Sequence, residues 1–161
     1  MVAMKQNISL KIALITAVAV ATLLTACNQR TVYDRYQSTP TAGWEKNDTL
    51  SFDIPPLDNA GNYYASLGLR TTDSYPFTAV TLIVEQHLLP SQRIVVDTVD
   101  CKLTDEQGKP LGSGIGYRQY QFTIGKLSLS ASDSLHILVR HDMKREILPG
   151  IADVGITLKK E

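Results

Sequence analysis

Residues 78–99 constrain the fold most, because apolar and polar side chains alternate along them with a period of two. On one parity the first half of this segment carries Val80, Leu82, Val84 and Leu88. The triplet Pro90-Ser91-Gln92 then interrupts the pattern with residues that favour a turn. The alternation resumes after the triplet, so the segment predicts two antiparallel strands joined as a β-hairpin.

The rest of the chain repeats this pattern in short segments, with turn residues about every ten positions. The clearest of these segments are 49–54, 63–70, 120–129, 134–141 and 154–158. Residues 112–116 carry alternate glycines, which predict a twisted or bulged strand that a ring or another backbone can approach. No segment after residue 27 has a helical period. The predicted fold is therefore all-β, an antiparallel β-sandwich with the jelly roll as one form of it.

The N-terminus has a different character. Two lysines precede an apolar run of 13 residues, 12–24, which is shorter than the roughly 18 to 20 residues that cross a bilayer. This arrangement predicts a signal peptide over residues 1–26. The run ends in Leu24-Thr25-Ala26-Cys27, which resembles the bacterial lipobox. We therefore expect lipid, such as palmitate, on Cys27, a short tether over 27–31 and a folded domain over 32–161.

Composition limits the function classes. The 135 residues from Cys27 onward fit one domain, and they carry 14 basic and 16 acidic side chains. No basic stripe is present, so nucleic acid is not an expected partner. If Cys27 carries lipid, Cys101 has no cysteine left to pair with, and we expect it to be a small buried residue.

The three histidines are the first candidates for chemistry. His136 and His141 are five residues apart in a predicted strand, so they should face opposite sides and cannot share a metal ion from that strand. His87 shares its parity with Glu85, which could hold a proton or an ion, although a solvated outer face is the favoured interpretation. The Gly-x-Ser-x-Gly nucleophile motif is absent. We expect no enzyme activity, metal or cofactor.

The aromatic residues allow two interpretations. Flat rings could stack on sugar faces, whereas Tyr and Trp also fill sandwich cores with one polar atom satisfied. The core interpretation is favoured for the group as a whole. The candidates for a binding surface are Trp44, Tyr64 and Tyr117.

Several stretches in order resemble the GldH family of gliding-motility lipoproteins of Bacteroidetes. They include the lipobox, Gly43-Trp44, Tyr75-Pro76-Phe77, the glycines of 108–116 and the ending Leu148-Pro149-Gly150-Ile151. The resemblance implies a non-enzymatic envelope lipoprotein connected with gliding and the type IX secretion machinery, which acts by binding other proteins. It supplies no catalytic residues.

The expected location is the periplasmic side of the envelope, because Asn28-Gln29-Arg30 lacks the acidic run expected of a surface-exported lipoprotein. Either membrane could carry the lipid, and the outer one is favoured. The expected partners are the membrane, through the lipid on Cys27, and other envelope or gliding-machinery proteins. The alternative is a glycan-binding envelope lipoprotein, which predicts an exposed aromatic shelf that contains Trp44 or neighbouring tyrosines.

Overall fold

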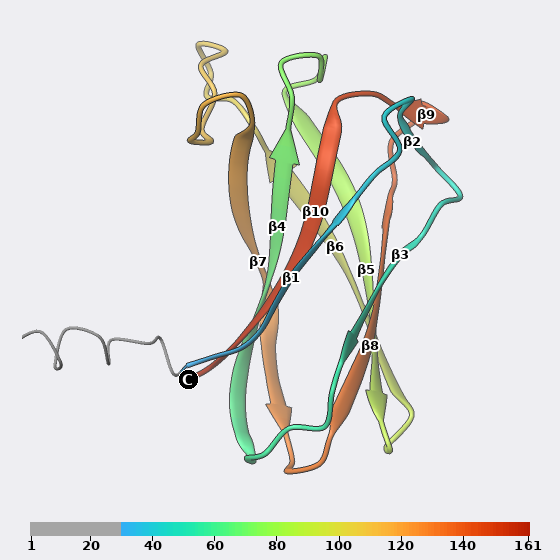
Figure 1. The fold of residues 1–161 in the computed structure, drawn as a ribbon, viewed down its shortest axis with the longest axis vertical. Coiled ribbons are helices and arrows are strands. Elements are labelled where there is room, and N and C mark those ends of the chain that lie inside the picture. Colours follow the sequence, from blue (N-terminus) through green and yellow to red (C-terminus); the bar gives the residue numbers. More distant parts are fainter. Residues whose placement is uncertain (1–29) are drawn as a thin grey trace, which may run out of the picture.

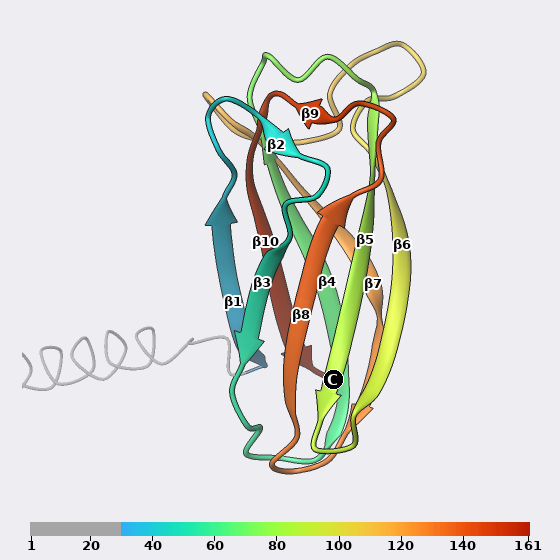
Figure 2. The same ribbon diagram turned by 90° about the vertical axis from the view of Figure 1, so that its right-hand side faces the viewer.

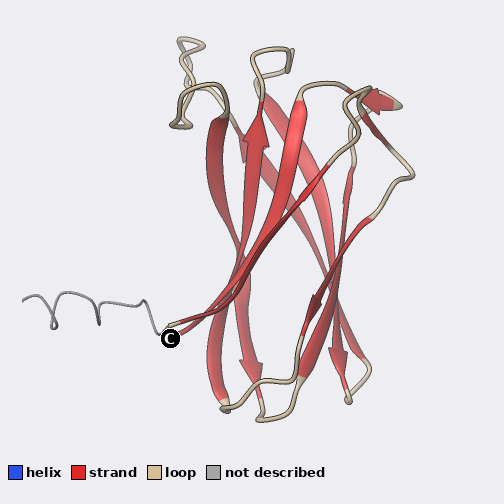
Figure 3. Ribbon diagram, viewed as in Figure 1, coloured by secondary structure: helices blue, strands red, loops and turns tan. Residues whose placement is uncertain are grey.

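The computed structural model describes residues 30–161; the predicted signal peptide and Cys27 lie outside this range. Within it the chain forms ten β-strands and no helix (Figure 3). Eight of them are long: β1 (Thr31–Ser38), β3 (Leu50–Ile54), β4 (Gly61–Thr71), β5 (Ala79–Leu89), β6 (Arg93–Lys102), β7 (Arg118–Leu129), β8 (Ser134–His141) and β10 (Ile151–Lys160). The other two, β2 (Trp44–Glu45) and β9 (Ile147–Leu148), pair in a short ribbon.

The long strands form two four-stranded antiparallel sheets that pack face to face (Figure 1). One sheet has the order β1-β10-β4-β7 and the other has the order β3-β8-β5-β6. The chain changes sheet at every connection between long strands except the hairpin β5–β6. This is the strand order of a jelly roll, so the predicted sandwich is confirmed in its jelly-roll form.

The predicted hairpin over 78–99 is present and longer than expected, since β6 continues to Lys102. Its register places Val80 opposite Cys101 and Leu82 opposite Val99, so the buried residues of both strands face the same side.

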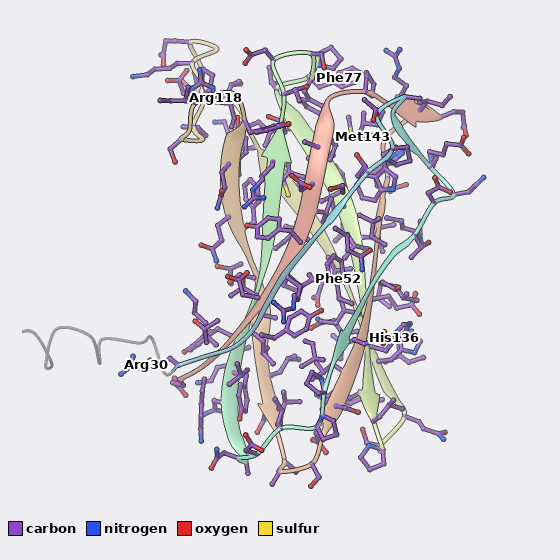
Figure 4. All side chains as sticks on the ribbon, viewed as in Figure 1. Arg30, Phe52, Phe77, Arg118, His136 and Met143 are labelled. Atoms are coloured by element: carbon purple, nitrogen blue, oxygen red, sulfur yellow. The ribbon has the colours of Figure 1, made fainter. Side chains whose placement is uncertain are left out.

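The core lies between the two sheets and is built from the inward parity of each strand. Phe52 of β3 illustrates its position, because the ring lies between the layers (Figure 4). On β5 the inward row also contains Gln86, which is buried and donates a hydrogen bond from Nε2 to Asp97 Oδ2 at 2.9 Å. Sequence periodicity identified the apolar members of this row and passed over the glutamine.

The prediction of a twisted or bulged strand at 112–116 is wrong. Residues 103–117 form a loop that holds only two isolated bridges, Thr104–Pro110 and Ser113–Gln119. The reason is local, since Gly114 and Gly116 have φ of 127° and 84°, outside the range of a β-strand.

The two ends of the described chain lie side by side. β1 pairs with β10, and Lys160 N donates to Arg30 O at 2.7 Å, so the chain enters the domain where it also ends (Figures 1 and 2). No helix in the described range has the length and apolar character needed to cross a bilayer.

Candidate binding surface

Four connections gather at one end of the sandwich, which we call the loop end. Because all neighbouring strands are antiparallel, the segments after β1, β4, β6 and β8 leave from the same end of the molecule (Figure 1). These segments are 39–49, 72–78, 103–117 and 142–150, and they include the β2–β9 ribbon. The opposite end carries the shorter segments 55–60, 90–92 and 130–133.

The loop end exposes large apolar side chains. Of the ten such side chains that are exposed in residues 30–161, half belong to these loops: Phe77, Leu111, Ile115, Tyr117 and Ile147. Phe77, Met143 and Arg118 mark this end in Figure 4. Apolar groups on ordered loops, away from the core, are typical of surfaces that bind a partner.

The segment 72–78 is held by its neighbours. Thr72 N donates to Gly150 O at 2.8 Å, and the Tyr75 hydroxyl donates to Ala79 O, the first residue of β5, at 2.8 Å. Gly150 has φ 81°, and a Cβ there would overlap the backbone of Tyr75. Burial raises the pKa of Tyr75, so its hydroxyl stays protonated as a donor. This segment therefore presents the exposed Phe77 from a fixed backbone.

Two glycines of the loop 103–117, Gly112 and Gly114, permit close approach, as the sequence predicted, although they lie in a loop. A Cβ on Gly112 would lie 2.6 Å from the ring of Tyr120. Gly114 has φ 127° and faces the backbone carbonyl of Tyr117. Arg118 Nη1 donates to Gly114 O at 3.3 Å and closes the turn that leads into β7.

A cavity of about 300 Å³ opens at the loop end beside Tyr117. Hydroxyl groups and one carboxylate dominate its lining, which consists of Ser38, Thr39, Thr41, Thr72, Ser74, Tyr117, Gly150, Ile151, Ala152 and Asp153. The Asp153 carboxylate is already engaged, since it accepts from Ser38 Oγ at 2.7 Å and pairs with Arg70 at 3.7 Å.

A larger groove of about 460 Å³ lies elsewhere, between the edge strands β1 and β3 and next to the point where the chain enters the domain. Its lining includes Tyr33, Arg35 and Asp53. Burial raises the pKa of Tyr33, which keeps that hydroxyl neutral.

The three predicted binding candidates do not form one shelf. Trp44 is fully buried, and its Nε1 donates to Asp48 O at 3.0 Å, so its ring is a core element with no face for a ligand. Tyr64 and Tyr117 are both exposed. Tyr64 pairs with Lys126 near the start of β4, whereas Tyr117 precedes Arg118, which pairs with Thr71 at the end of β4. The two rings therefore lie at opposite ends of the sheet.

The histidines are arranged as predicted in one respect. His141 is fully buried and His136 faces outward, so the two lie on opposite faces of β8. His87 contacts Glu85, as their shared parity suggested, with Nε2 and Oε1 2.5 Å apart. The approach of His87 to His136 was not predicted, because it depends on the register between β5 and β8. Among residues 30–161, no three His, Cys, Asp or Glu side chains surround one point.

Cys101 is fully buried and unpaired, in agreement with its predicted role as a small core residue. Burial raises the pKa of its thiol to about 12, and the neighbouring Asp100 adds to the shift. The thiol is therefore neutral and unreactive at physiological pH.

The stretches that carry the family resemblance lie largely at the loop end. Trp44 pairs with Leu148 in the β2–β9 ribbon, and Tyr75 packs against Gly150. The glycine pattern 108–116 lies in the loop beside them. These residues fix the conformation of the loops.

Known protein sequences resemble this chain over most of its length. The sequence profile described as GldH lipoprotein matches residues 31–158, which cover nearly all of the sandwich. The gliding motility lipoprotein GldH of Flavobacterium johnsoniae is 28% identical over 148 residues, or 88% of this chain and 92% of the relative. The gliding motility lipoprotein GldH homolog of Christiangramia forsetii is 24% identical over 147 residues, or 86% and 89% of the two chains.

Solved structures resemble this chain with lower sequence identity. A carbohydrate-binding module specific for non-crystalline cellulose has a TM-score of 0.47 at 10% identity, over 80% of this chain and 73% of that chain. The globular domain of zebrafish complement 1qA protein has a TM-score of 0.45 at 10% identity, over 81% and 96%. The sequence profile and both curated relatives agree over most of the chain, and the protein belongs to the GldH lipoprotein family.

Proposed function

We propose that this protein is a non-enzymatic lipoprotein of the cell envelope, which supports gliding motility or the associated type IX secretion machinery by binding other envelope proteins. Membership of a family named for gliding motility supports the general role. The binding role rests on the loop end, where apolar side chains are exposed on loops that Gly150, Tyr75 and Asp105 hold in place.

The anchor fits this role. Lipid on Cys27 would hold the chain on the periplasmic face of the outer membrane, three residues before the first described residue. β1 begins at Thr31 and runs to the loop end over eight residues. At about 3.3 Å per residue, the loop end lies about 25 Å from the point where the chain enters the domain. A partner can therefore reach the loop end at a distance from the lipid surface.

Complementation of a gene-deletion strain tests the proposal. We expect deletion to reduce surface spreading and type IX secretion, and the double variant Leu111→Asp/Ile115→Asp to fail to restore them. The matched control is Ile94→Asp/Val96→Asp, which places the same charges at exposed positions of the β6 outer face. Membrane levels of both variants should equal those of the wild type. Normal spreading and secretion in the deletion strain would refute the proposal.

Glycan binding is a second candidate function, because the cavity beside Tyr117 is lined by hydroxyl groups that suit sugar hydroxyls. The buried Trp44 removes the ring on which the aromatic shelf was first expected. Screening of the purified protein on an array of bacterial and plant glycans tests this candidate. Binding that Tyr117→Ala weakens and Tyr64→Ala leaves unchanged would support it, and an array without signal would reject it.

A further inference from the structure

Two histidines face each other on the outer face of the sheet β3-β8-β5-β6. His87 of β5 and His136 of β8 are direct partners in the antiparallel register. Both belong to the parity opposite the buried residues, and His136 points away from the core in Figure 4. Their ring centroids are 6.1 Å apart, with an angle of 70° between the ring planes. The fold thus brings together two imidazoles that are 49 residues apart in the sequence.

Each imidazole is backed by a carboxylate. Asp53 of β3, the register partner of His136, places Oδ1 2.6 Å from His136 Nδ1. Glu85 Oε1 lies 2.5 Å from His87 Nε2. A nitrogen that contacts a carboxylate carries the proton, so in the neutral rings His136 Nε2 and His87 Nδ1 keep their lone pairs. These are the nitrogens that remain able to bind a metal.

We propose that His87 and His136 bind one divalent transition-metal ion, with Zn²⁺ as the first choice. Imidazole nitrogen is a preferred ligand of Zn²⁺, and a carboxylate behind a ligating histidine orients the ring and raises its basicity. Asp53 and Glu85 also balance the double positive charge of the ion. This histidine pair with its two carboxylates is called the histidine site below.

The rings lie edge to face, so binding requires them to rotate until the two free nitrogens converge. Both histidine side chains are partly exposed, at 30% for His87 and 39% for His136, so solvent reaches both rings. No third ligand from the described residues completes the site. The ion therefore keeps positions for water or for a ligand from a partner, and it binds more weakly than in a four-ligand structural site.

Nuclear magnetic resonance of the full-length chain in detergent micelles, labelled with ¹⁵N at histidine, tests the proposal with an internal control. His141 is buried, with Nε2 3.1 Å from Trp44 O and Nδ1 3.4 Å from Met143 N, so both of its nitrogens are occupied. Addition of Zn²⁺ should shift the imidazole signals of His87 and His136 and leave those of His141 in place.

Variants measured by calorimetry separate ligands from positioning residues. Each single variant, His87→Asn or His136→Asn, should abolish saturable Zn²⁺ binding. Because both cysteines are still present in these variants, such a loss would assign the binding to the histidines and not to the thiols. Asp53→Asn should weaken binding by about 10- to 100-fold, because it changes only the group that orients His136. The control Thr98→Ala, on the outer face of β6, should bind as the wild type does.

Copper provides a further check, since Cu²⁺ should bind more tightly than Zn²⁺ at a site of imidazole ligands. Two results would overturn the proposal. One is the absence of saturable Zn²⁺ binding below about 1 mM. The other is Zn²⁺ binding that persists in the double variant His87→Asn/His136→Asn.

Discussion

At the scale of single residues, close contacts explain why certain positions are occupied by glycine. Tyr36, Gly155 and Gly68 occupy one row across β1, β10 and β4. The Tyr36 ring lies over both glycines on the outer face of the sheet, and the Arg70 guanidinium stacks on the ring at 4.2 Å. Burial by these contacts raises the pKa of the Tyr36 hydroxyl. The two glycines are needed because any side chain there would occupy the place of the ring.

Replacement of Gly155 by alanine tests this contact. A Cβ there would lie 2.7 Å from the Tyr36 ring, so the ring must move, and we expect Gly155→Ala to lower the free energy of unfolding by about 1–3 kcal/mol. Gly125→Ala is the matched control, since its Cβ would meet nothing within 4 Å. The control should be neutral or slightly stabilising in urea unfolding. Equal losses in the two variants would contradict this account.

His141 gives a residue-scale prediction of pH dependence. Burial lowers the pKa of its imidazole below the ordinary value of 6.5, and protonation would also break its bond to Met143 N. The unfolded chain therefore binds the proton more readily, and stability from this group is complete above pH 6.5 and is lost as the pH falls below it.

Urea unfolding at pH 7.5 and pH 5 measures this effect. We expect the wild type to be less stable at pH 5, and His141→Gln to show a smaller difference between the two pH values. Thr98→Ala, which changes no titratable group, should retain the wild-type difference. An unchanged difference in His141→Gln would assign the pH dependence to other groups.

At the scale of elements, β10 is the strand on which the first sheet depends. It lies between β1 and β4, and the residue that follows it contacts Lys126 of β7. Glu161, directly after β10, accepts hydrogen bonds from Asn62, Tyr64 and Lys126 at 2.8–2.9 Å. These three donors hold the pKa of Glu161 at about 2. An exposed cluster of charged and polar groups therefore links Glu161 to β4 and β7.

The variant Glu161→Gln tests whether this hydrogen-bonded cluster stabilises the fold. Because the folded pKa lies below the ordinary value of 4.5, the contribution of Glu161 to stability is complete above pH 4.5 and is lost as the pH falls towards 2. We expect the variant to melt at a lower temperature than the wild type at pH 7, with the difference vanishing near pH 2. High salt should reduce the effect, since the pair Lys126–Glu161 is exposed. A difference independent of pH would point to another cause.

At the scale of the whole molecule, the jelly roll separates the entry of the chain from its loop end. The chain enters beside the end of β10, so Arg30 and Lys160 share one region (Figure 1). The four longer connections gather at the loop end, and the histidine site lies on the outer face of the sheet that does not contain β1. The proposed lipid on Cys27 would therefore leave both candidate surfaces free.

Cys27→Ser tests the attachment itself. A serine hydroxyl cannot form the thioether to lipid, so we expect the variant to lose its membrane anchor and to leave the detergent phase on phase separation. Cys101→Ala is the control, because Cys101 is buried in the sandwich and should not affect partition. Membrane retention of Cys27→Ser after carbonate washing would show that the anchor is a different segment.

The sequence by itself determined the fold class and much of the core. Alternation along 78–99 predicted the hairpin because a strand that buries one face must place apolar residues at every second position. Parity also predicted the opposite orientations of His136 and His141, and cysteine count predicted an unpaired, buried Cys101. The order of short motifs identified the family, and the profile match to residues 31–158 confirms it.

Only the tertiary structure decided which distant residues meet, because register between strands is set by the packing of the whole sandwich. It brought His87 beside His136 and placed Tyr36 over Gly155. It also buried Trp44, whose sequence context suited either a core or a binding surface. Residues 112–116 depart from their strand prediction because Gly114 and Gly116 adopt positive φ, which alternate glycines permit and a strand excludes.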